Sequence, residues 1–479
     1  MSSEIKLRGN LRLKAAFLTL GCKLNQFESE AIADSFSSLG AEIVSLEFPS
    51  DDAEPEAPGA ERDVRVADIY IVNTCTVTSK SEQKARRIIR KIARSFPGAA
   101  VIVTGCYAQL ERDEISKLAD NLAVVPQDRK ELLLKLPDSI FDKNFVSADF
   151  INYLKEAVAD ESSASSSAEN SFYTIKSEYT FHSRAFLKIQ DGCDNFCAYC
   201  RVPFARGKSR SLEHISVISN IKSLEAAGYR EVVLTGVNIS AYQSGKLDLV
   251  TLTEEILGAT EKIRVRFSSI EPDNISKRYL NIIGSERVCG HFHLPVQSGA
   301  DSVLEAMGRR YSRARVIEAV EILRSGAKNP LICADVITGF PGETEKDFME
   351  TISLAEQLAL AYLHVFPFSK RPGTAASKMK NVVPERVSRE RAEALRKLSD
   401  ELFAKYALGW EGQVVEALLE GAGDKAGEMW KALSSNYLKL IVGGAPAGAE
   451  LKGLIARCLV KNHRAGEGNC FDAEFISLV

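Results

Sequence analysis

Three buried strands are predicted near the start of the chain, and each of them runs into a cysteine. They span residues 14–22, 67–75 and 99–109, and they contain Cys22, Cys75 and Cys106. Helical stretches separate them, which predicts a parallel sheet with helices packed on it. Residues after the carboxyl ends of parallel strands gather along one edge, so the three thiols are predicted to converge. The alternative is three unrelated buried thiols, although each cysteine is followed by a polar loop.

A second group of cysteines lies in one short segment, with the spacing Cys193-x3-Cys197-x2-Cys200. Three thiolates in one loop can hold three irons of a [4Fe–4S] cluster and leave the fourth iron without a protein ligand. Such an open iron indicates a site for a substrate or cofactor. The alternative is a zinc knuckle, which needs a fourth Cys or His at close spacing. The nearest candidate is His214.

The order of predicted strands and helices indicates an α/β protein with three parts. Residues 1–159 predict the parallel-sheet domain, interrupted by an acidic, proline-rich insertion at 50–61, and residues 160–180 have the composition of a flexible linker. Residues 181–408 alternate strands and helices, which predicts a partial TIM-like (β/α) barrel with its chemistry at the carboxyl ends of the strands. Residues 409–479 contain short β-like runs and predict a small antiparallel β-barrel.

Composition narrows the function classes. The chain has 479 residues and a formal net charge of −3, so any binding to nucleic acid depends on local basic patches. We expect no membrane span, because no run of about 18 apolar residues occurs, and no secretory signal. Ten cysteines without such a signal indicate metal binding or catalysis in a reducing compartment, which predicts a cytoplasmic protein.

The stretch DGCDNFCAYC resembles the CxxxCxxC signature of the radical S-adenosylmethionine (SAM) enzymes, in which the open iron binds and cleaves SAM. Together with the three-cysteine domain and the small final barrel, the chain resembles the radical SAM methylthiotransferases. The resemblance implies two [4Fe–4S] clusters, one of them an auxiliary cluster on Cys22, Cys75 and Cys106, and a terminal TRAM domain. It also implies a flavodoxin- or ferredoxin-like electron donor and a sulfur donor.

The segments TLGCKLNQFESE and NTCTVTSKSEQKAR resemble those of the branch of that family that acts on N6-threonylcarbamoyladenosine beside the tRNA anticodon. This resemblance implies that one SAM yields a radical that removes hydrogen from adenine C2, and that a second SAM methylates the sulfur that is inserted. Two alternatives stay open within the family, namely action on isopentenyladenosine in tRNA or on an aspartate of a ribosomal protein. A zinc-bearing RNA-binding protein without enzymatic activity is the alternative of another class.

Several loop residues are candidates for cofactor binding. By resemblance, TGVN at 235–238 holds the methionine end of SAM, and the GxIxGxxE-like element supports its adenine. Residues that end predicted strands are candidate ribose or substrate contacts, although a polar group that merely caps a loop is the alternative at each position. The candidates are Thr235, Gly236, Asn238, Glu271, Gln297, Ile337, Gly339 and Glu343.

RNA contacts are predicted just beyond the second cysteine group and in the final barrel. Arg206, Lys208 and Arg210 form a basic run there, and Tyr437 is a candidate for stacking on a base. Arg86, Arg90 and Arg94 form a stripe on a predicted helix that could bind phosphates, with an ordinary solvated face as the alternative.

Overall fold

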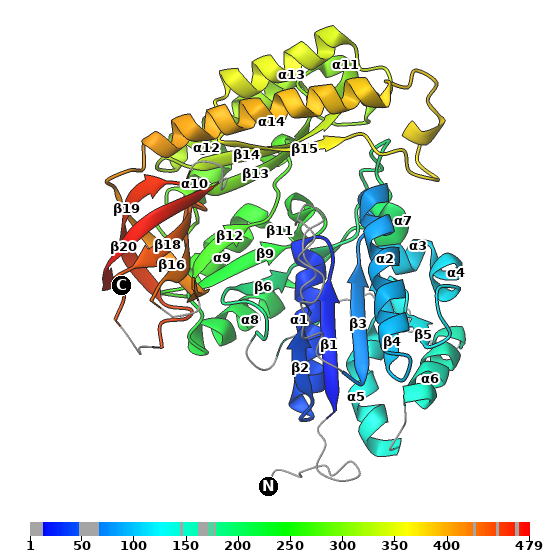
Figure 1. The fold of residues 1–479 in the computed structure, drawn as a ribbon. Helices are drawn as coiled ribbons and strands as arrows, with labels where there is room; N and C mark the ends of the chain where they lie inside the picture. The colour runs from blue at the N-terminus through cyan, green and yellow to red at the C-terminus, as the bar shows by residue number, and fades with distance from the viewer. Residues whose placement is uncertain are drawn as a thin grey trace. The chain divides into compact units, whose positions relative to one another are not determined.

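The computed structural model describes residues 13–46, 67–143, 147–160, 172–173, 175, 179–424, 428–446, 450–464 and 469–479. It divides into two compact units (Figure 1). Unit 1 comprises the chain up to Phe181 together with Arg201–Gly207, and unit 2 comprises His182–Cys200 and Lys208–Val479. The predicted insertion at 50–61 and most of the predicted linker lie outside the described residues. The predicted boundary between residues 408 and 409 stays a prediction, since both of its sides belong to unit 2.

Unit 1 is built on a five-stranded, all-parallel sheet of order β2-β1-β3-β4-β5. Its elements are β1 (Lys14–Thr19), α1 (Lys23–Ser38), β2 (Glu42–Ser45), β3 (Ile69–Thr74), α2 (Ser79–Ser95), β4 (Ala100–Gly105), α3 (Cys106–Leu110), α4 (Arg112–Ser116), β5 (Leu122–Val124), α5 (Glu131–Lys143), α6 (Ser147–Ala159) and α7 (Val202–Arg206). The predicted parallel sheet is confirmed. Two short strands at its edges, β2 and β5, are not predicted from the sequence.

Helices cover both faces of this sheet because successive side chains of a strand point to opposite sides. Ala15 and Phe17 of β1 pack with residues of α1, α5 and α6. Ala16 and Leu18 pack instead with the apolar stripe of α2. The apolar spacing of Ala85-x2-Ile88-Ile89-x2-Ile92 turns one side of α2 to the sheet and leaves its cationic side outward.

Unit 2 begins with a partial barrel of parallel strands, as predicted. The strands form two sheets, β6-β9-β12 and β13-β14-β15, joined by isolated parallel bridges such as Ser269 with His293. The elements are β6 (Ala185–Lys188), β7 (Gln190–Asp191), β8 (Arg210–Ser211), α8 (His214–Ala226), β9 (Glu231–Thr235), β10 (Gln243–Ser244), β11 (Leu247–Asp248), α9 (Leu249–Ala259), β12 (Arg264–Phe267), α10 (Leu280–Ile283), β13 (His291–Gln297), α11 (Asp301–Ala306), α12 (Arg313–Gly326), β14 (Leu331–Thr338), α13 (Glu345–Gln357), β15 (Tyr362–Pro367) and α14 (Glu385–Leu408).

The end of the chain closes into a five-stranded barrel in the order β16-β17-β18-β20-β19. Its strands are β16 (Val414–Ala422), β17 (Trp430–Ser434), β18 (Lys439–Gly443), β19 (Ile455–His463) and β20 (Cys470–Leu478). The prediction of a small β-barrel is confirmed, with one correction. β18 and β20 pair in parallel, because β19 lies between them in sequence and pairs antiparallel with β20 on its other side.

Buried charges occupy the end of the partial barrel at which the strands begin. Glu231, the first residue of β9, accepts hydrogen bonds from Arg264 and Arg266 of β12. Arg266 also donates to the carbonyl oxygens of Ser434 and Ser435 in the C-terminal barrel. This end of the partial barrel is therefore filled, and the loops at the opposite, carboxyl ends of the strands are left for a site. Among the residues described, no helix has both the length and the apolar character needed to cross a membrane.

Candidate functional site

The three amino-terminal cysteines lie at the carboxyl ends of neighbouring parallel strands. Cys22 is the N-cap of α1, Cys75 follows β3, and Cys106 is the first residue of α3. Burial raises the pKa of the Cys75 thiol to about 12, and the nearby Cys22 and Cys106 contribute to this rise. Such mutual electrostatic influence requires the sulfurs to be close. The predicted convergence of the three thiols is therefore observed within unit 1.

Two glycines allow the strands to end so close together. Gly21 has a φ of +106°, and a Cβ built on it would lie 2.6 Å from the Cβ of Cys75. Gly105 has a φ of +98°, and its Cβ would lie 2.3 Å from the carbonyl oxygen of Thr74. A side chain at either position would clash with backbone or with a cysteine in a conformation that only glycine adopts readily. The pattern Gly-Cys at two of the three strand ends is thus a geometric requirement.

The prediction that Arg206 contacts RNA is corrected by the structure. The residue is only 5% exposed and belongs to unit 1. Its Nε donates to the Sγ of Cys106 at 3.2 Å, and its two Nη atoms donate to the carboxylate of Glu28 and the amide oxygen of Asn25. A buried guanidinium whose three nitrogens all have protein acceptors cannot also bind a phosphate. Arg206 is instead part of the surroundings of the first cysteine triad.

The second triad lies in the loop between β7 and the start of α7, and its three cysteines belong to unit 2. The amide of Cys200 donates to the carbonyl of Cys197 at 2.9 Å, which folds the loop back on itself. Ala198 anchors the loop to its surroundings, since its amide donates to the Met307 carbonyl and its carbonyl accepts from the Ala376 amide. Phe196 takes a left-handed φ of 47° at the turn. Backbone hydrogen bonds therefore hold the cysteine loop in place.

Arg309 is a site residue that sequence reasoning does not find. Its Nη1 donates to the Sγ of Cys197 at 3.2 Å, its Nε donates to the hydroxyl of Tyr311, and its Nη2 pairs with Glu271. Burial raises the pKa of Glu271 to about 7, although the Arg309 guanidinium opposes the shift. Glu271, a predicted ribose or substrate contact, is thus held close to the cysteine loop. Nothing in sequence spacing marks Arg309, which lies among other arginines in MGRRYSR.

The loop after β9 contains the predicted methionine-binding element, whose role stays a prediction. Gly236 is required there because a Cβ would lie 2.7 Å from the carbonyl oxygen of Gln190. The amide of Asn238 donates to Gln190 Oε1, while Asn238 Oδ1 is buried and has no hydrogen-bond partner in the described part of the chain. A buried acceptor without a donor is costly, so a ligand that brings an N–H would satisfy it. Thr235 ends β9 and places this loop at the carboxyl edge of the sheet.

The remaining cofactor candidates lie at the ends of β13 and β14. Gln297 closes β13 with a left-handed φ of 68°, and Ile337 lies in β14. A Cβ on Gly339 would lie 2.4 Å from the side chain of Ser388. Glu343 Oε2 accepts from the amide of Gly339 at 2.6 Å and from Arg391 at 2.7 Å. This carboxylate therefore stabilises the glycine loop itself, and a direct contact with adenine stays a prediction.

The other residues predicted to contact RNA differ in their exposure and in the partners that they already have. Lys208 is exposed, whereas Arg210 lies 4.0 Å from the carboxylate of Asp191. The ring of Tyr437 stacks on His291, with centroids 4.1 Å apart, and the Arg266 guanidinium lies 5.2 Å from its centroid. Tyr437 thus already has an aromatic partner and a cationic partner within unit 2, and its stacking on a base stays a prediction.

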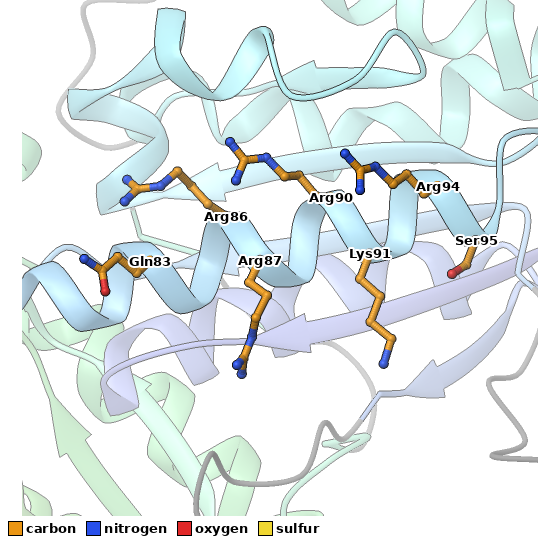
Figure 2. Close-up of a pocket in the computed structure, with 7 residues that line it drawn as sticks. All are labelled: Gln83, Arg86, Arg87, Arg90, Lys91, Arg94 and Ser95. Carbon is orange, nitrogen blue, oxygen red and sulfur yellow. The ribbon is translucent and has the colours of Figure 1, made fainter. Parts of the chain in front are cut away.

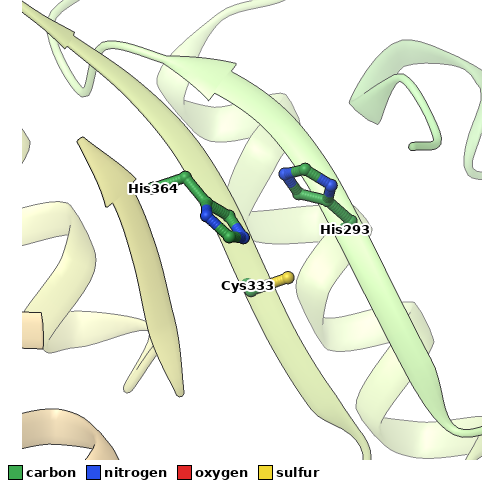
Figure 3. A group of neighbouring side chains, drawn as sticks. All are labelled: His293, Cys333 and His364. Atoms are coloured by element: carbon green, nitrogen blue, oxygen red, sulfur yellow. The ribbon is translucent and has the colours of Figure 1, made fainter. Parts of the chain in front are cut away.

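A histidine cluster lies on the three adjacent strands β13, β14 and β15 (Figure 3). The ligand atoms of His293, Cys333 and His364 all lie within 4.8 Å of one another. Both ring nitrogens of His293 already have partners, however, because Nδ1 is 3.1 Å from Ser269 Oγ and Nε2 is 2.8 Å from Asp335 Oδ1. This arrangement is that of a hydrogen-bonded histidine, and it leaves no ring nitrogen of His293 free for a metal.

A basic groove of about 590 Å³ follows helix α2 (Figure 2). Arg86, Arg90 and Arg94 project along one side of the helix, and Arg87 and Lys91 project along another. Arg86 donates a hydrogen bond to the Tyr107 hydroxyl and forms an ion pair with Glu114, whereas Arg90 and Arg94 are exposed. The surface of α2 therefore offers a row of guanidinium groups spaced by single helical turns.

Each cysteine triad offers three thiols of the kind that hold the irons of a four-iron cluster. All ten cysteines are free thiols, so none of the six is withdrawn by a disulfide. Three thiolates around a cubane leave one iron open for another ligand.

Comparisons with known proteins match nearly the whole chain. The family model described as the Radical SAM superfamily matches residues 187–355, and that of the uncharacterized protein family UPF0004 matches residues 56–126. The chain is 37% identical to the threonylcarbamoyladenosine tRNA methylthiotransferase MtaB of Treponema pallidum, over 90% of this chain and 95% of that protein. It is 35% identical to the protein of the same name from Bacillus subtilis, over 90% of each chain.

The fold is also shared with a solved structure. The radical S-adenosylmethionine methyltransferase TsrM from Kitasatospora setae, solved with cobalamin and a [4Fe–4S] cluster, aligns with a TM-score of 0.51 and 15% sequence identity. The alignment covers 76% of this chain and 74% of that one. At this identity the likeness concerns the fold alone.

Proposed function

We propose that this chain, which belongs to the radical SAM methylthiotransferase family, inserts a methylthio group at C2 of N6-threonylcarbamoyladenosine in tRNA. Membership rests on relatives that are 35–37% identical and match 90% of this chain. The structural observation that carries the proposal is the pair of cysteine triads, one at the strand ends of unit 1 and one in the loop of unit 2. When bound, the two [4Fe–4S] clusters and SAM supply a radical that removes hydrogen from C2 and a methylated sulfur for transfer.

The residues of unit 2 hold SAM and keep it oriented. Cys193, Cys197 and Cys200 bind three irons, which leaves the fourth for the methionine end of SAM. Asn238 Oδ1, buried without a partner in the described residues, would accept a hydrogen bond from the amino group of bound SAM. Gly236 and Gly339 keep the neighbouring loops in positions that a Cβ would not permit. Arg309 and Glu271 lie beside the cysteine loop and fix its polar surroundings.

The residues of unit 1 hold the auxiliary cluster and provide a surface for RNA. Cys22, Cys75 and Cys106 bind that cluster at the sheet edge, where Gly21 and Gly105 allow their approach. The exposed guanidinium groups on α2 bind backbone phosphates of the tRNA. In unit 2, the exposed Lys208 is a separate cation for a phosphate contact. Because tRNA is the substrate, we expect the protein to act in the cytoplasm, with an electron donor and a sulfur donor as further partners.

An assay with purified protein tests this function. The anaerobically reconstituted chain is incubated with SAM, a low-potential reductant and tRNA that carries either threonylcarbamoyladenosine or isopentenyladenosine, and the nucleosides are analysed by mass spectrometry. We expect a methylthio group on threonylcarbamoyladenosine only, and none after Cys197→Ala. Methylthiolation of isopentenyladenosine alone would assign the chain to the other tRNA branch. A loaded enzyme that modifies neither substrate would refute the proposal.

A further inference from the structure

We infer that Arg206 is a positioning residue of the auxiliary cluster, whose reduction potential it sets through a hydrogen bond on the Cys106 sulfur. The inference rests on the proposed function, because it requires a cluster on Cys22, Cys75 and Cys106. It assigns a role to a residue whose place in sequence, close behind the other cysteine triad, gives no hint of it. Two features of unit 1 support it, namely a fixed guanidinium and a sulfur in direct contact with it.

The guanidinium of Arg206 is fixed by a two-pronged contact with Glu28. Nη1 donates to Glu28 Oε1 at 2.9 Å and Nη2 donates to Glu28 Oε2 at 3.1 Å, while Nη2 also donates to Asn25 Oδ1 at 3.0 Å. The side chains of Arg206 and Glu28 are 1% and 0% exposed. A planar, doubly held guanidinium cannot rotate, so its remaining Nε–H keeps pointing at the sulfur of Cys106, 3.2 Å away.

The carboxylate of Glu28 is shared by two basic side chains. Lys130 is completely buried and also donates to Glu28 Oε2, and Gln127 donates to Oε1. Burial lowers the pKa of Lys130, and the neighbouring Arg206 acts in the same direction while Glu28 opposes it. The guanidinium of Arg206 keeps its charge in proteins, so it is the cation that lies against the Cys106 sulfur.

A cluster held by three thiolates would bring negative charge against the Arg206 guanidinium. The positive charge of Arg206 and its directed N–H both favour the more negative, reduced state of the cluster. Hydrogen bonds to the sulfurs and net local charge are the levers by which proteins set iron–sulfur potentials, and both act more strongly in a buried site than in water. Arg206 should therefore raise the reduction potential of the auxiliary cluster, whereas Glu28 should lower it.

The test measures that potential in a full-length chain that carries only the auxiliary cluster. The parent has Cys193, Cys197 and Cys200 replaced by alanine, and its cluster is titrated anaerobically with the reduced signal followed by electron paramagnetic resonance. Arg206→Gln should shift the midpoint to a more negative potential. Glu28→Gln should shift it to a more positive one, because it removes the buried negative charge beside the Arg206 guanidinium. The control is Arg201→Gln, in the same short segment as Arg206. It breaks partly buried pairs with Glu82 and Glu111 and should leave the potential unchanged.

Each outcome distinguishes a purely structural role of Arg206 from an effect on the reduction potential of the cluster. Opposite shifts in the two variants support the inference, since a merely structural role would lower cluster content without opposite changes in potential. Unchanged potentials, or shifts in the same direction, would overturn it. If Arg206→Gln takes up no cluster, Glu28→Gln decides alone, and anything but a positive shift contradicts the inference. A parent that takes up no iron at all would count against the proposed function instead.

Discussion

At the scale of single residues, each cysteine triad has one sulfur that accepts a hydrogen bond from a buried arginine. Arg206 donates to Cys106 in unit 1, and Arg309 donates to Cys197 in unit 2, both at 3.2 Å. Each arginine is in turn held by a carboxylate, Glu28 in the first case and Glu271 in the second. The chain thus has the same local arrangement twice, in which a paired guanidinium lies against a cysteine sulfur that we propose as a cluster ligand.

Glu231 gives a residue-scale prediction for stability. Although burial alone would raise its pKa, Arg266 and Arg264 hold it well below the usual carboxyl range. Glu231→Gln should cost about 3–5 kcal/mol of unfolding free energy, because it leaves buried arginines without their counter-charge. Urea unfolding of the full chain measures the loss. Glu318→Gln, which breaks an exposed pair with Arg315, should cost at most about 1 kcal/mol; equal losses would contradict this prediction.

The same carboxylate fixes the sign of a pH dependence. Because the pKa of Glu231 is lower in the folded chain than in the unfolded one, its stabilisation is complete above the ordinary carboxyl pKa. That contribution is lost only as the pH falls toward the depressed folded value. The stability difference between wild type and Glu231→Gln should therefore shrink in acid and stay constant around neutrality.

The six cysteines can be predicted as cluster ligands from the sequence, but the arginines that contact two of their sulfurs cannot. Cysteine spacing and strand ends are local patterns, whereas Arg206 and Glu28 are 178 residues apart and meet only in the fold. A basic run behind a cysteine motif has the same composition whether it faces solvent or the interior, which is why the prediction of an RNA contact for Arg206 is wrong. Arg309 cannot be recognised from the sequence either, because it lies in MGRRYSR among other arginines and no spacing distinguishes it from them.

At the scale of elements, the end of β4 depends on a residue without a side chain. Gly105→Ala should destabilise the chain by about 3 kcal/mol, since the new Cβ would meet the Thr74 carbonyl in a conformation that alanine avoids. Gly40→Ala is the matched control, with a similar positive φ of +87° but no atom within 4 Å of the new Cβ, and should cost about 1 kcal/mol. Denaturant unfolding compares the two, and equal costs would exclude the proposed clash.

Helix α2 allows a test of the RNA surface. Arg90→Gln with Arg94→Gln should weaken tRNA binding and reduce the slope of log affinity against log salt by about 0.9 for each phosphate that the protein no longer neutralises. The control removes the same charge from α14, with Arg386→Gln and Arg389→Gln, two arginines that pair with glutamates at the surface. If both double variants show the wild-type slope, α2 is an ordinary solvated face.

At the scale of the whole molecule, the proposed reaction requires two clusters in one chain. Anaerobic reconstitution should give about eight irons per chain, and replacement of either cysteine triad by alanine should leave about four. Iron analysis together with the visible absorption spectrum measures both. Zinc at one or two atoms per chain without a visible chromophore would instead favour the RNA-binding protein that lacks enzymatic activity.

Much of the architecture can be predicted because strands and helices alternate with clear apolar periods. The exceptions are features that leave no local pattern in the sequence. Strands β2 and β5 are too short to show an apolar period, and they lie at sheet edges. The parallel pairing of β18 with β20 depends on barrel closure, which no local pattern reports. The assignment of Arg201–Gly207 to unit 1 is likewise a tertiary fact, because its flanking segments both belong to unit 2.

The most direct test of the central claim is nucleoside analysis of tRNA from a strain that lacks this gene. We expect threonylcarbamoyladenosine to accumulate without its methylthio group. Wild-type protein should restore the methylthio derivative, whereas Cys106→Ala and Cys197→Ala, one from each triad, should not. If the methylthio derivative persists undiminished in a deletion strain that has no second enzyme of this family, the claim is contradicted.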